Sequence, residues 1–539
     1  MHGGRRLRRV LTLVGVFAVG VTLLTGAVAA VDASDRNAVT ALDGPIGTEP
    51  LDGANGTTEV IVRFTPNGEP DADDHAVADE LRDHAAAEQV AFEAFAAEHD
   101  AITIESEFWL VNAMLVVVDA DAVAADELLA VANVTDIHAN VEIGTLGSKT
   151  DERRGAFGEE RTGDTTSQTG TPPGEHTSGL ELIGAPDAWN RFDTRGAGAT
   201  VAVIDTGVDP DHQDIDLDGW AQYDENGTLV SDDLADAADP NGHGTHVAGT
   251  VAGGNASGTH IGVAPDASVY GIDTFDADGM ATFASVLAGM EHATAAEEVD
   301  VLQMSLGANG TFGGFIRPVR NARAADKVVV AASGNTGPGT SSSPANTYDS
   351  LAVGAVRTDR TVATFSSGES INKTAAFADP PAEWPDRYVV PDVTAPGVNV
   401  LSADAGTVDG YVEQQGTSMA APHVSGIAAL AVAATDGRIE GDDLQSVIVD
   451  TAVRPDGDVE PDDRYGHGVV DATAAVESSI ETAPQPTPTP TPTPTATPPS
   501  TPEAVDPATS DRTPGFGVGV GVVAVIVTAM ATAVVGRHE

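Results

Sequence analysis

The sequence predicts an α/β fold for residues 179–480, with a parallel sheet flanked by helices, preceded by a small α+β domain at residues 57–145. The larger domain is predicted from apolar runs that each stop at a polar or glycine-rich turn: 200–204, 267–272, 299–304 and 327–332. Near-continuous apolar runs are typical of parallel strands that are buried on both faces. Helical segments are expected between them, at 282–296 and 315–325. Ligand sites of open α/β sheets collect at the carboxyl ends of the strands, so the residues after these runs are the first functional candidates.

The smaller domain is predicted from alternating strand and helix patterns. Its expected elements are a strand at 58–64, a helix at 74–98, a strand or hairpin at 108–119, a short helix at 123–131 and a last strand at 134–143. A β-α-β-β-α-β order is that of a ferredoxin-like sandwich. Residues 146–178 are rich in Gly, Thr, Ser and charge, and are therefore expected to be a linker that is open to cleavage.

The composition restricts the classes of function. The chain has 539 residues, enough for a large core and at least one further domain. It carries 82 acidic and 26 basic residues, a net charge of -56, which excludes a nucleic-acid binder that works through a basic surface. An Asp-rich, Lys-poor surface stays soluble in very high salt, so we predict a halophilic archaeal source. Without cysteine, a thiol nucleophile, disulfides and Cys-ligated zinc are excluded.

Both ends of the chain resemble targeting segments. Residues 1–30 join four arginines to an uncharged apolar stretch that closes in small residues. This pattern predicts an export signal, with a twin-arginine route favoured by the paired arginines and a retained membrane helix as the alternative. Residues 481–513 form a Thr/Pro-rich stalk that cannot build a core. Within the last segment, 514–539, the uncharged run 517–536 is just long enough to span a bilayer.

Ser418 lies in the segment GTSMAAPHVSG, ahead of an uncharged run of small and apolar residues that is expected to form a buried helix. The first turn of a helix has unpaired N–H groups and a partial positive charge. A serine placed there is either an N-cap or a nucleophile with a neighbouring N–H that stabilises an oxyanion. The local pattern leaves both interpretations open, and the choice depends on the rest of the chain.

Asp205 and His243 supply what a serine nucleophile needs. Asp205 in AVIDTGVDPDH follows an expected strand, and His243 in NGHGTHVAGTVAG lies just before or inside a small-residue helix. An imidazole takes the proton of the serine hydroxyl, and a carboxylate holds that imidazole in the right tautomer. The chain order Asp, His, Ser is one of the known orders of this triad.

The three segments DTGVD, HGTHVAG and GTSMAAPHVSG resemble the signatures of the subtilisin-like serine proteases (subtilases), including the halolysin-like members of halophilic archaea. The likeness runs from about residue 180 to residue 471. It implies an endopeptidase that hydrolyses protein or peptide substrates through an acyl-enzyme, with no cofactor required for the chemistry. Carried over residue by residue, it implies Asp205 as orienting acid, His243 as general acid/base and Ser418 as nucleophile.

The resemblance also implies the groups that hold the substrate. Asn335 in ASGNTG matches the family's oxyanion-hole residue, and an amide N–H₂ at a strand end suits that role. The segments MSLG and AASG resemble the strands that bind the substrate backbone and line the pocket before the scissile bond. The substrate-binding residues implied are Ser305, Leu306, Gly307, Ala332, Ser333 and Gly334.

Further implications concern metal and processing. Asp214 and Asn255 fall where many subtilases bind a structural calcium, although the loop GGNASGTH departs from the usual pattern and surface charge is the alternative interpretation of Asp214. Residues 57–145 resemble the inhibitor-type propeptide, which is cleaved off in the linker. The motif Pro514-Gly515-Phe516, with the helix and basic end behind it, resembles an archaeal PGF-type sorting signal. It implies an exported protein on the cell surface, anchored by a lipid after processing or by a plain transmembrane helix.

Two other functions are alternatives to a subtilase. An aspartic protease needs two carboxylates that share a proton, and the chain has no second Asp-Ser/Thr-Gly motif of that kind, so this class is rejected. A catalytically weak surface module for binding or structure is the remaining alternative. Loss of a triad residue would be its mark, and the sequence retains all three.

Overall fold

The computed structural model describes residues 51, 56–68, 76–146, 174–277, 279–455, 457 and 460–485. The predicted export signal, most of the linker, nearly all of the stalk and the C-terminal signal lie outside the described residues. The chain divides into two units, residues 1–484 and residues 485–539, and the description below concerns the first.

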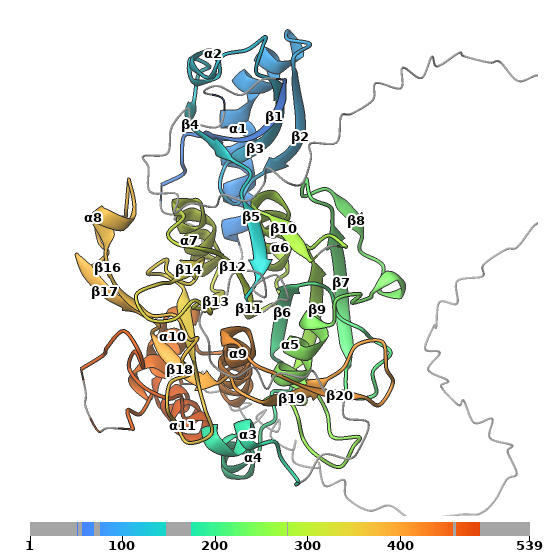
Figure 1. Cartoon of the computed structure of the whole chain (residues 1–539), viewed down its shortest axis with the longest axis vertical. Helices are drawn as coiled ribbons and strands as arrows, with labels where there is room; N and C mark the ends of the chain where they lie inside the picture. Colours follow the sequence, from blue (N-terminus) through green and yellow to red (C-terminus); the bar gives the residue numbers. More distant parts are fainter. Residues whose placement is uncertain are drawn as a thin grey trace, which may run out of the picture. The chain divides into compact units, whose positions relative to one another are not determined.

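The larger domain is built on an eight-stranded sheet of order β18-β15-β13-β11-β6-β9-β7-β8 (Figure 1). Neighbouring strands are parallel, except that β8 runs antiparallel to β7. The four predicted strands, β13, β11, β6 and β9, are adjacent at its centre. The strands are β6 (Thr200–Asp205), β7 (Leu217–Tyr223), β8 (Leu229–Ser231), β9 (Ser268–Asp273), β11 (Val301–Met304), β13 (Val328–Ala332), β15 (Leu351–Val356) and β18 (Val393–Pro396).

Helices cover both faces of this sheet, which confirms the predicted α/β fold. Successive strand residues point to opposite faces: Val201 and Val203 pack with the helices of one face, and Ala202 and Ile204 with those of the other. The first face carries α4 (Ala185–Phe192), α5 (His243–Ala252), α9 (Thr417–Ala434), α10 (Gly441–Asp450) and α11 (Ala472–Thr482). The second face carries α6 (Phe283–Ala295) and α7 (Ile316–Ala324).

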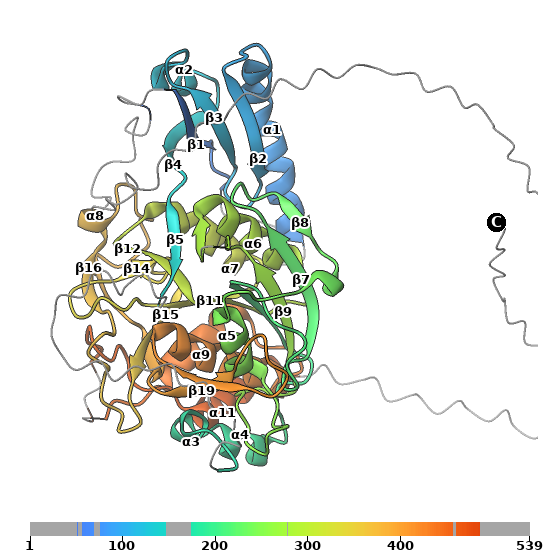
Figure 2. The same cartoon turned by 45° about the vertical axis from the view of Figure 1, so that its right-hand side comes forward.

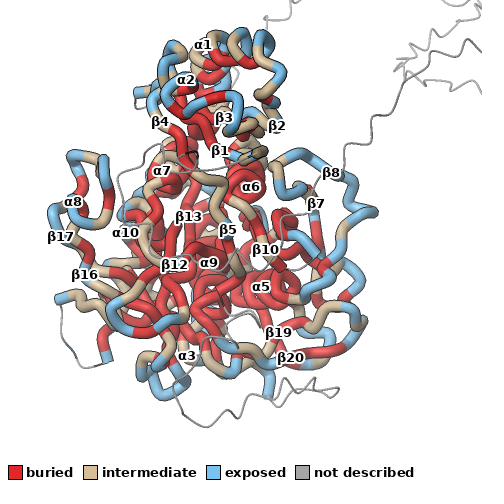
Figure 3. The backbone as a smooth tube through the Cα atoms, turned by 45° about the horizontal axis from the view of Figure 1, so that its top comes forward, coloured by how far each residue is buried: buried red, intermediate tan, exposed pale blue. Residues whose placement is uncertain are grey.

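Helix α9 runs through the interior of the larger domain, as its uncharged sequence predicts (Figure 3). It is the one helix among the described residues that is long and apolar enough to cross a membrane, and 89% of it is buried inside the protein. Its apolarity is therefore that of a core helix.

The smaller domain has the predicted β-α-β-β-α-β order, in an antiparallel sheet of strand order β2-β3-β1-β4. Its strand at 102–108 was not predicted, because this edge strand alternates between exposed and buried positions and carries few apolar residues. The elements are β1 (Thr57–Phe64), α1 (Val77–Ala97), β2 (Ile102–Phe108), β3 (Ala113–Asp119), α2 (Ala125–Leu129) and β4 (Val134–Ala139).

The single last strand predicted at 134–143 is wrong, because the chain leaves the small sheet after β4. Residues Glu142–Thr145 form a separate strand, β5, in a sheet of order β10-β5-β12-β14 (Figure 2). Strand β5 runs antiparallel to both of its neighbours, β10 (Met280–Thr282) and β12 (Leu306–Asn309). The end of the small domain is thus an inner strand of a sheet that the larger domain supplies.

Short elements complete the larger domain outside its central sheet. They are α3 (Ser178–Ile183), η3 (Leu234–Asp236), η4 (Gly313–Phe315), β14 (Ser342–Ser343), β16 (Glu369–Asn372), α8 (Lys373–Ala376), β17 (Arg387–Val390), β19 (Val400–Ala403) and β20 (Tyr411–Gln414).

Candidate active site

Asp205 and His243 form a buried pair at the carboxyl end of the central sheet. Asp205 is the last residue of β6, His243 is the first residue of α5, and His243 Nδ1 lies 2.7 Å from Asp205 Oδ1. A side chain at Gly244 would prevent this approach, because a Cβ there would lie 2.0 Å from the carbonyl oxygen of Gly207. Burial alone would lower the pKa of His243, but the charge and hydrogen bond of Asp205 outweigh it and raise that pKa above its ordinary value.

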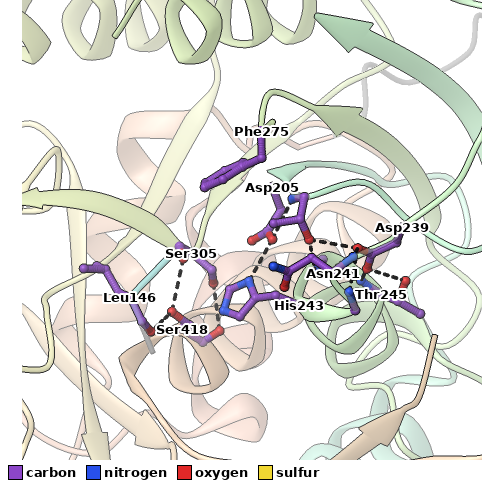
Figure 4. A network of polar contacts seen from close by, with 12 residues as sticks. Leu146, Asp205, Asp239, Asn241, His243, Thr245, Phe275, Ser305 and Ser418 are labelled. Carbon is purple, nitrogen blue, oxygen red and sulfur yellow. Dashed lines mark hydrogen bonds and ion pairs between the residues drawn. The ribbon is translucent and has the colours of Figure 1, made fainter. Parts of the chain in front are cut away.

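Ser418 is the second residue of α9 and is fully buried. Its hydroxyl donates to the carbonyl oxygen of Leu146, with the carbonyl oxygen of Ser305 as a second acceptor at 3.1 Å. The ring of His243 points from Asp205 toward Ser418 (Figure 4). Its Nε2 has no hydrogen-bond partner among the described residues, so this nitrogen is free to take a proton.

Asn335 lies beyond the carboxyl end of β13, and its amide is held in one orientation. Its Oδ1 accepts from the Thr417 N–H at 2.9 Å and from Thr417 Oγ1 at 3.1 Å. Its Nδ2 is buried and has no partner within the described part of the chain. A Cβ built on Gly416 would lie 3.3 Å from this Nδ2 and 3.2 Å from the Leu146 carbonyl oxygen. The free amide N–H₂ of Asn335 and the carbonyl oxygen of Leu146, which Ser418 contacts, therefore lie close to the same side of Gly416.

Three of the predicted substrate-binding residues contact the end of the small domain. Leu306 and Gly307 pair with Thr145 and Gly144, and the Ser305 carbonyl oxygen accepts from the Leu146 N–H at 3.4 Å. The side chain of Leu146 is buried close to Gly307, where a Cβ would lie 3.3 Å from Leu146 Cδ1. The first residue of the predicted linker is thus an apolar side chain buried against the larger domain.

The other three predicted residues, 332–334, lie at the end of β13 and just after it. Ala332 belongs to the same apolar cluster as Leu146. Ser333 Oγ donates to the Ser367 carbonyl oxygen at 3.1 Å, and the Gly334 N–H donates to Thr417 Oγ1 at 3.2 Å. Within the described residues, none of the three forms a hydrogen bond with residues 142–146. The hydrogen bonds of Ser333 and Gly334 support the loop of Asn335 and Thr417, and the part of residues 332–334 in substrate binding stays a prediction.

Asp214 and Asn255 come from neighbouring loops but do not present a calcium site. One oxygen of Asp214 accepts from the Ala256 N–H at 2.6 Å, and the other accepts from the Tyr411 hydroxyl at 2.5 Å. The amide of Asn255 contacts His260 Nε2 at 3.1 Å. No group of three His, Cys, Asp or Glu residues that could hold a metal occurs in the part of the chain that the structure describes. Calcium takes six to eight oxygen ligands, so Asp214 and Asn255 as arranged do not fit it.

Sequence reasoning missed two residues of the candidate site. Leu146 was expected only to begin a linker, although its carbonyl contacts Ser418. Asp239, four residues before His243, accepts hydrogen bonds around the start of α5. An aspartate shortly before a helix is a recognisable capping signal, and it was available in the sequence.

An Asp–His pair on a parallel sheet, with a serine at the first turn of a core helix, defines an α/β protein with a serine-hydrolase type of site. The model of the subtilase family matches residues 196–468. The chain is 38% identical over 252 residues to M-protease of Shouchella clausii (strain KSM-K16), covering 47% of this chain and 58% of that protein. It is 38% identical to Subtilisin Savinase of Lederbergia lenta over 252 residues, covering 47% of this chain and 82% of that protein.

Subtilisin DY of Bacillus licheniformis is also 38% identical, over 260 residues that cover 47% of this chain and 82% of that protein. The chain belongs to the subtilase family. All of these matches cover about half of the chain, and the match to M-protease covers little more than half of that relative.

Proposed function

We propose that the chain is a subtilisin-like serine endopeptidase whose site is formed by Asp205, His243, Ser418 and Asn335. The observation that carries the proposal is the contact between the Ser418 hydroxyl and the Leu146 carbonyl, at the end of a strand that pairs with β12. A peptide carbonyl beside a serine, an imidazole with a free nitrogen and an unused amide donor are the parts that acyl transfer needs.

The proposed reaction follows from these positions. Ser418 Oγ attacks the carbonyl carbon of the peptide bond while its proton passes to His243 Nε2, and Asp205 stabilises the imidazolium. The negative charge that develops on the carbonyl oxygen is stabilised by Asn335 Nδ2 and the Ser418 N–H. His243 then gives the proton to the leaving amine, and an acyl-enzyme on Ser418 remains. Water, deprotonated by His243, hydrolyses this ester and restores the serine.

The first substrate in this proposal is the chain itself, at the bond between Leu146 and Gly147. Residues 57–145 then act as a propeptide, because β5 fills the strand position that another substrate would need. The buried Leu146 side chain supports a preference for an apolar residue before the cleaved bond. Export and anchoring at the cell surface of a halophile are proposed from composition and end segments alone.

The test is Ser418→Ala in the full chain, assayed in high salt on casein and by intact mass. Ser446→Ala, another helical serine, is the matched control. Ser446 lies in α10, and its hydroxyl donates to the Asp442 carbonyl oxygen, its one hydrogen bond within the described residues. We expect the parent and the control to show a new N-terminus at residue 147 and to cleave casein, and Ser418→Ala to do neither. A Ser418→Ala variant that cleaves casein as fast as the parent would overturn the proposed nucleophile.

A further inference from the structure

Asp239 is a buried carboxylate that holds three parts of the chain together next to the proposed site. Its side chain is 8% exposed. Its Oδ1 accepts from Thr206 Oγ1 at 3.0 Å and from the N–H groups of Asn241 and Gly242 at 3.1 and 2.7 Å. Its Oδ2 accepts from the N–H and the hydroxyl of Thr245 at 2.8 and 2.7 Å. These five donors use the acceptor capacity of a carboxylate in full.

The hydrogen bonds that Asp239 accepts from the Gly242 and Thr245 N–H groups fix the start of α5. Gly242, the residue before His243, has a φ of 90° and offers no side-chain cap, so the first N–H groups of the helix need another acceptor. Asp239 supplies it, with a negative charge that suits a helix N-terminus. The direction in which the helix presents His243 is therefore set by Asp239.

Further hydrogen bonds link α5 to β6, the strand that carries Asp205 (Figure 4). The Thr206 hydroxyl donates to Asp239 and accepts from the Gly244 N–H at 3.0 Å. The Thr206 N–H donates at 2.8 Å to Asp205 Oδ1, the same oxygen that His243 Nδ1 contacts. Asp239 and Thr206 thus connect β6, the strand that carries Asp205, to α5, the helix that carries His243.

The charge of Asp239 also acts on His243. It adds to that of Asp205 in opposing the effect of burial, and so helps to raise the pKa of His243. Burial raises the pKa of Asp239 itself, while its bonds to Thr245 and Gly242 favour the charged form.

We propose that Asp239 is a positioning residue for the reaction: it keeps Asp205 and His243 in their mutual geometry and adds a second negative charge beside the imidazolium. Thr206 relays this role between the strand and the helix. The inference rests on the proposed function of Asp205, His243 and Ser418.

The first test replaces Asp239 by Asn, which keeps the shape but removes the charge and turns one acceptor into a donor. Asp233→Asn is the matched control, because Asp233 also caps a short helix, η3, by accepting from the Ala235 N–H. For Asp239→Asn we expect kcat to fall by about 100-fold, the scale of a small misplacement of reacting groups, with KM changed by less than about 2-fold. We also expect the acid limb of kcat/KM to move to lower pH, because His243 loses a supporting charge. The control should match the parent in both respects.

A loss of stability alone would reduce the number of active molecules without moving the pH profile. Activity is therefore referred to active sites titrated with a serine-reactive organophosphate. An Asp239→Asn enzyme with the parental kcat per active site, or with an unmoved acid limb, would overturn the proposal.

A second pair of variants tests the connection through Thr206 and leaves Asp239 unchanged. These variants also provide a test if the Asp239→Asn chain does not cleave itself to the active form. Thr206→Val has the shape of threonine without its hydroxyl, and Thr206→Ser keeps the hydroxyl. We expect Thr206→Val to lower kcat by about 10-fold and Thr206→Ser to stay within about 2-fold of the parent, as for a lost bond to a charged group. Equal activity of the two variants would refute the relay. If Ser418→Ala stays active, the proposed function itself fails; if only the Asp239 and Thr206 results fail, the positioning role alone does.

Discussion

The small domain meets the larger one in two regions that bind by different chemistry. The tail, residues 142–146, pairs its backbone with β10 and β12 and buries the side chains of Ile143 and Leu146. The body, residues 57–139, is held by side chains of the larger domain. The carboxylate of Glu291 accepts from the Leu110 N–H at 2.7 Å, and Asn321 Nδ2 donates to the Leu110 carbonyl oxygen at 2.5 Å.

This difference shows how one surface can serve both a general and a specific role. Backbone pairing accepts many sequences, because the ladder uses groups that every residue except proline carries. The tail region is therefore suited to varied peptides. The body region depends on particular side chains at particular positions, so it recognises its own domain. A peptide that is to be cleaved would bind at the tail region alone, whereas the inhibiting small domain would bind at both the tail and the body region.

The largest effect is expected from Leu146→Asp, which tests whether the tail is bound as a substrate. A carboxylate in the apolar position of Leu146 costs several kcal/mol or neutralises by taking up a proton. We expect self-cleavage, followed by intact mass, to slow by about 100-fold or more, since about 1.4 kcal/mol is a factor of ten. Leu146→Met conserves volume and should stay within about 10-fold of the parent. Cleavage of Leu146→Asp at the parental rate and position would show that this side chain does not select the bond.

A smaller effect is expected in the body region from Glu291→Ala. The Leu110 N–H loses its acceptor at a buried interface, which costs about 1–3 kcal/mol. The lower end of this range corresponds to about 5-fold weaker retention of the cleaved domain. Glu291→Gln keeps an acceptor and should stay closer to the parent. The measurement is the delay between cleavage and the appearance of activity, which should shorten for Glu291→Ala alone. An unchanged delay in Glu291→Ala would mean that this bond does not hold the domain.

The same residue predicts a pH dependence. Burial raises the pKa of Glu291 to about 8 in the complex. A carboxyl whose pKa is higher in the complex than in the free protease favours binding when it is protonated. Retention should therefore be strongest at low pH and should weaken as the pH rises toward 8. From pH 6 to pH 9 we expect release to accelerate by about 10-fold in the parent and to vary much less in Glu291→Gln. A parental release rate that does not rise over this range would contradict the assignment.

The four strands at the centre of the sheet were predictable because they are largely buried on both faces and mostly apolar, as β13 is throughout. The outer strand β7 was not predicted, since it is partly exposed and carries polar residues. Strand β5 was not predictable, since its pattern indicates a strand but not which sheet it joins. Its partners, β10 and β12, follow more than a hundred residues later in the chain. The same limit applies to Leu146, whose contact with Ser418 joins residues 272 positions apart.

The candidate site was predictable where short motifs carry the chemistry. Asp205, His243 and Asn335 come from separate segments, and the parallel sheet gathers them at one edge because each lies near the carboxyl end of a strand or at the start of a helix. The capping signal of Asp239 was present in the sequence, but its link to the hydroxyl of Thr206, from another segment, could not be predicted. A motif shows which groups are present, but not which of them are joined through a third group.

The smallest effect is expected from His138, at the point where the body passes into the tail. Its ring lies edge-on to Phe283 and Phe312, with centroids 5.5 and 5.3 Å away. Burial and the positive charge of Arg63 lower the pKa of His138 to about 3. The contribution of His138 to retention therefore requires the neutral ring. This contribution is fully present above the ordinary pKa of about 6.5 and decreases as the pH falls below it.

This dependence is opposite in sign to that of Glu291, so the two groups together predict slowest release in mildly acid solution, between the ordinary pKa values of a glutamate and a histidine, about pH 4.3 to 6.5. In Glu291→Gln, where the alkaline dependence is absent, we expect release at pH 5 to be a few-fold faster than at pH 7. This change is smaller than the factor of about 10 that a pKa shift of one full unit can produce. Adding His138→Phe, which keeps an aromatic ring between Phe283 and Phe312, should remove that acid dependence. If the double variant releases its domain faster at pH 5 than at pH 7 as the single variant does, another group senses acid in the body region.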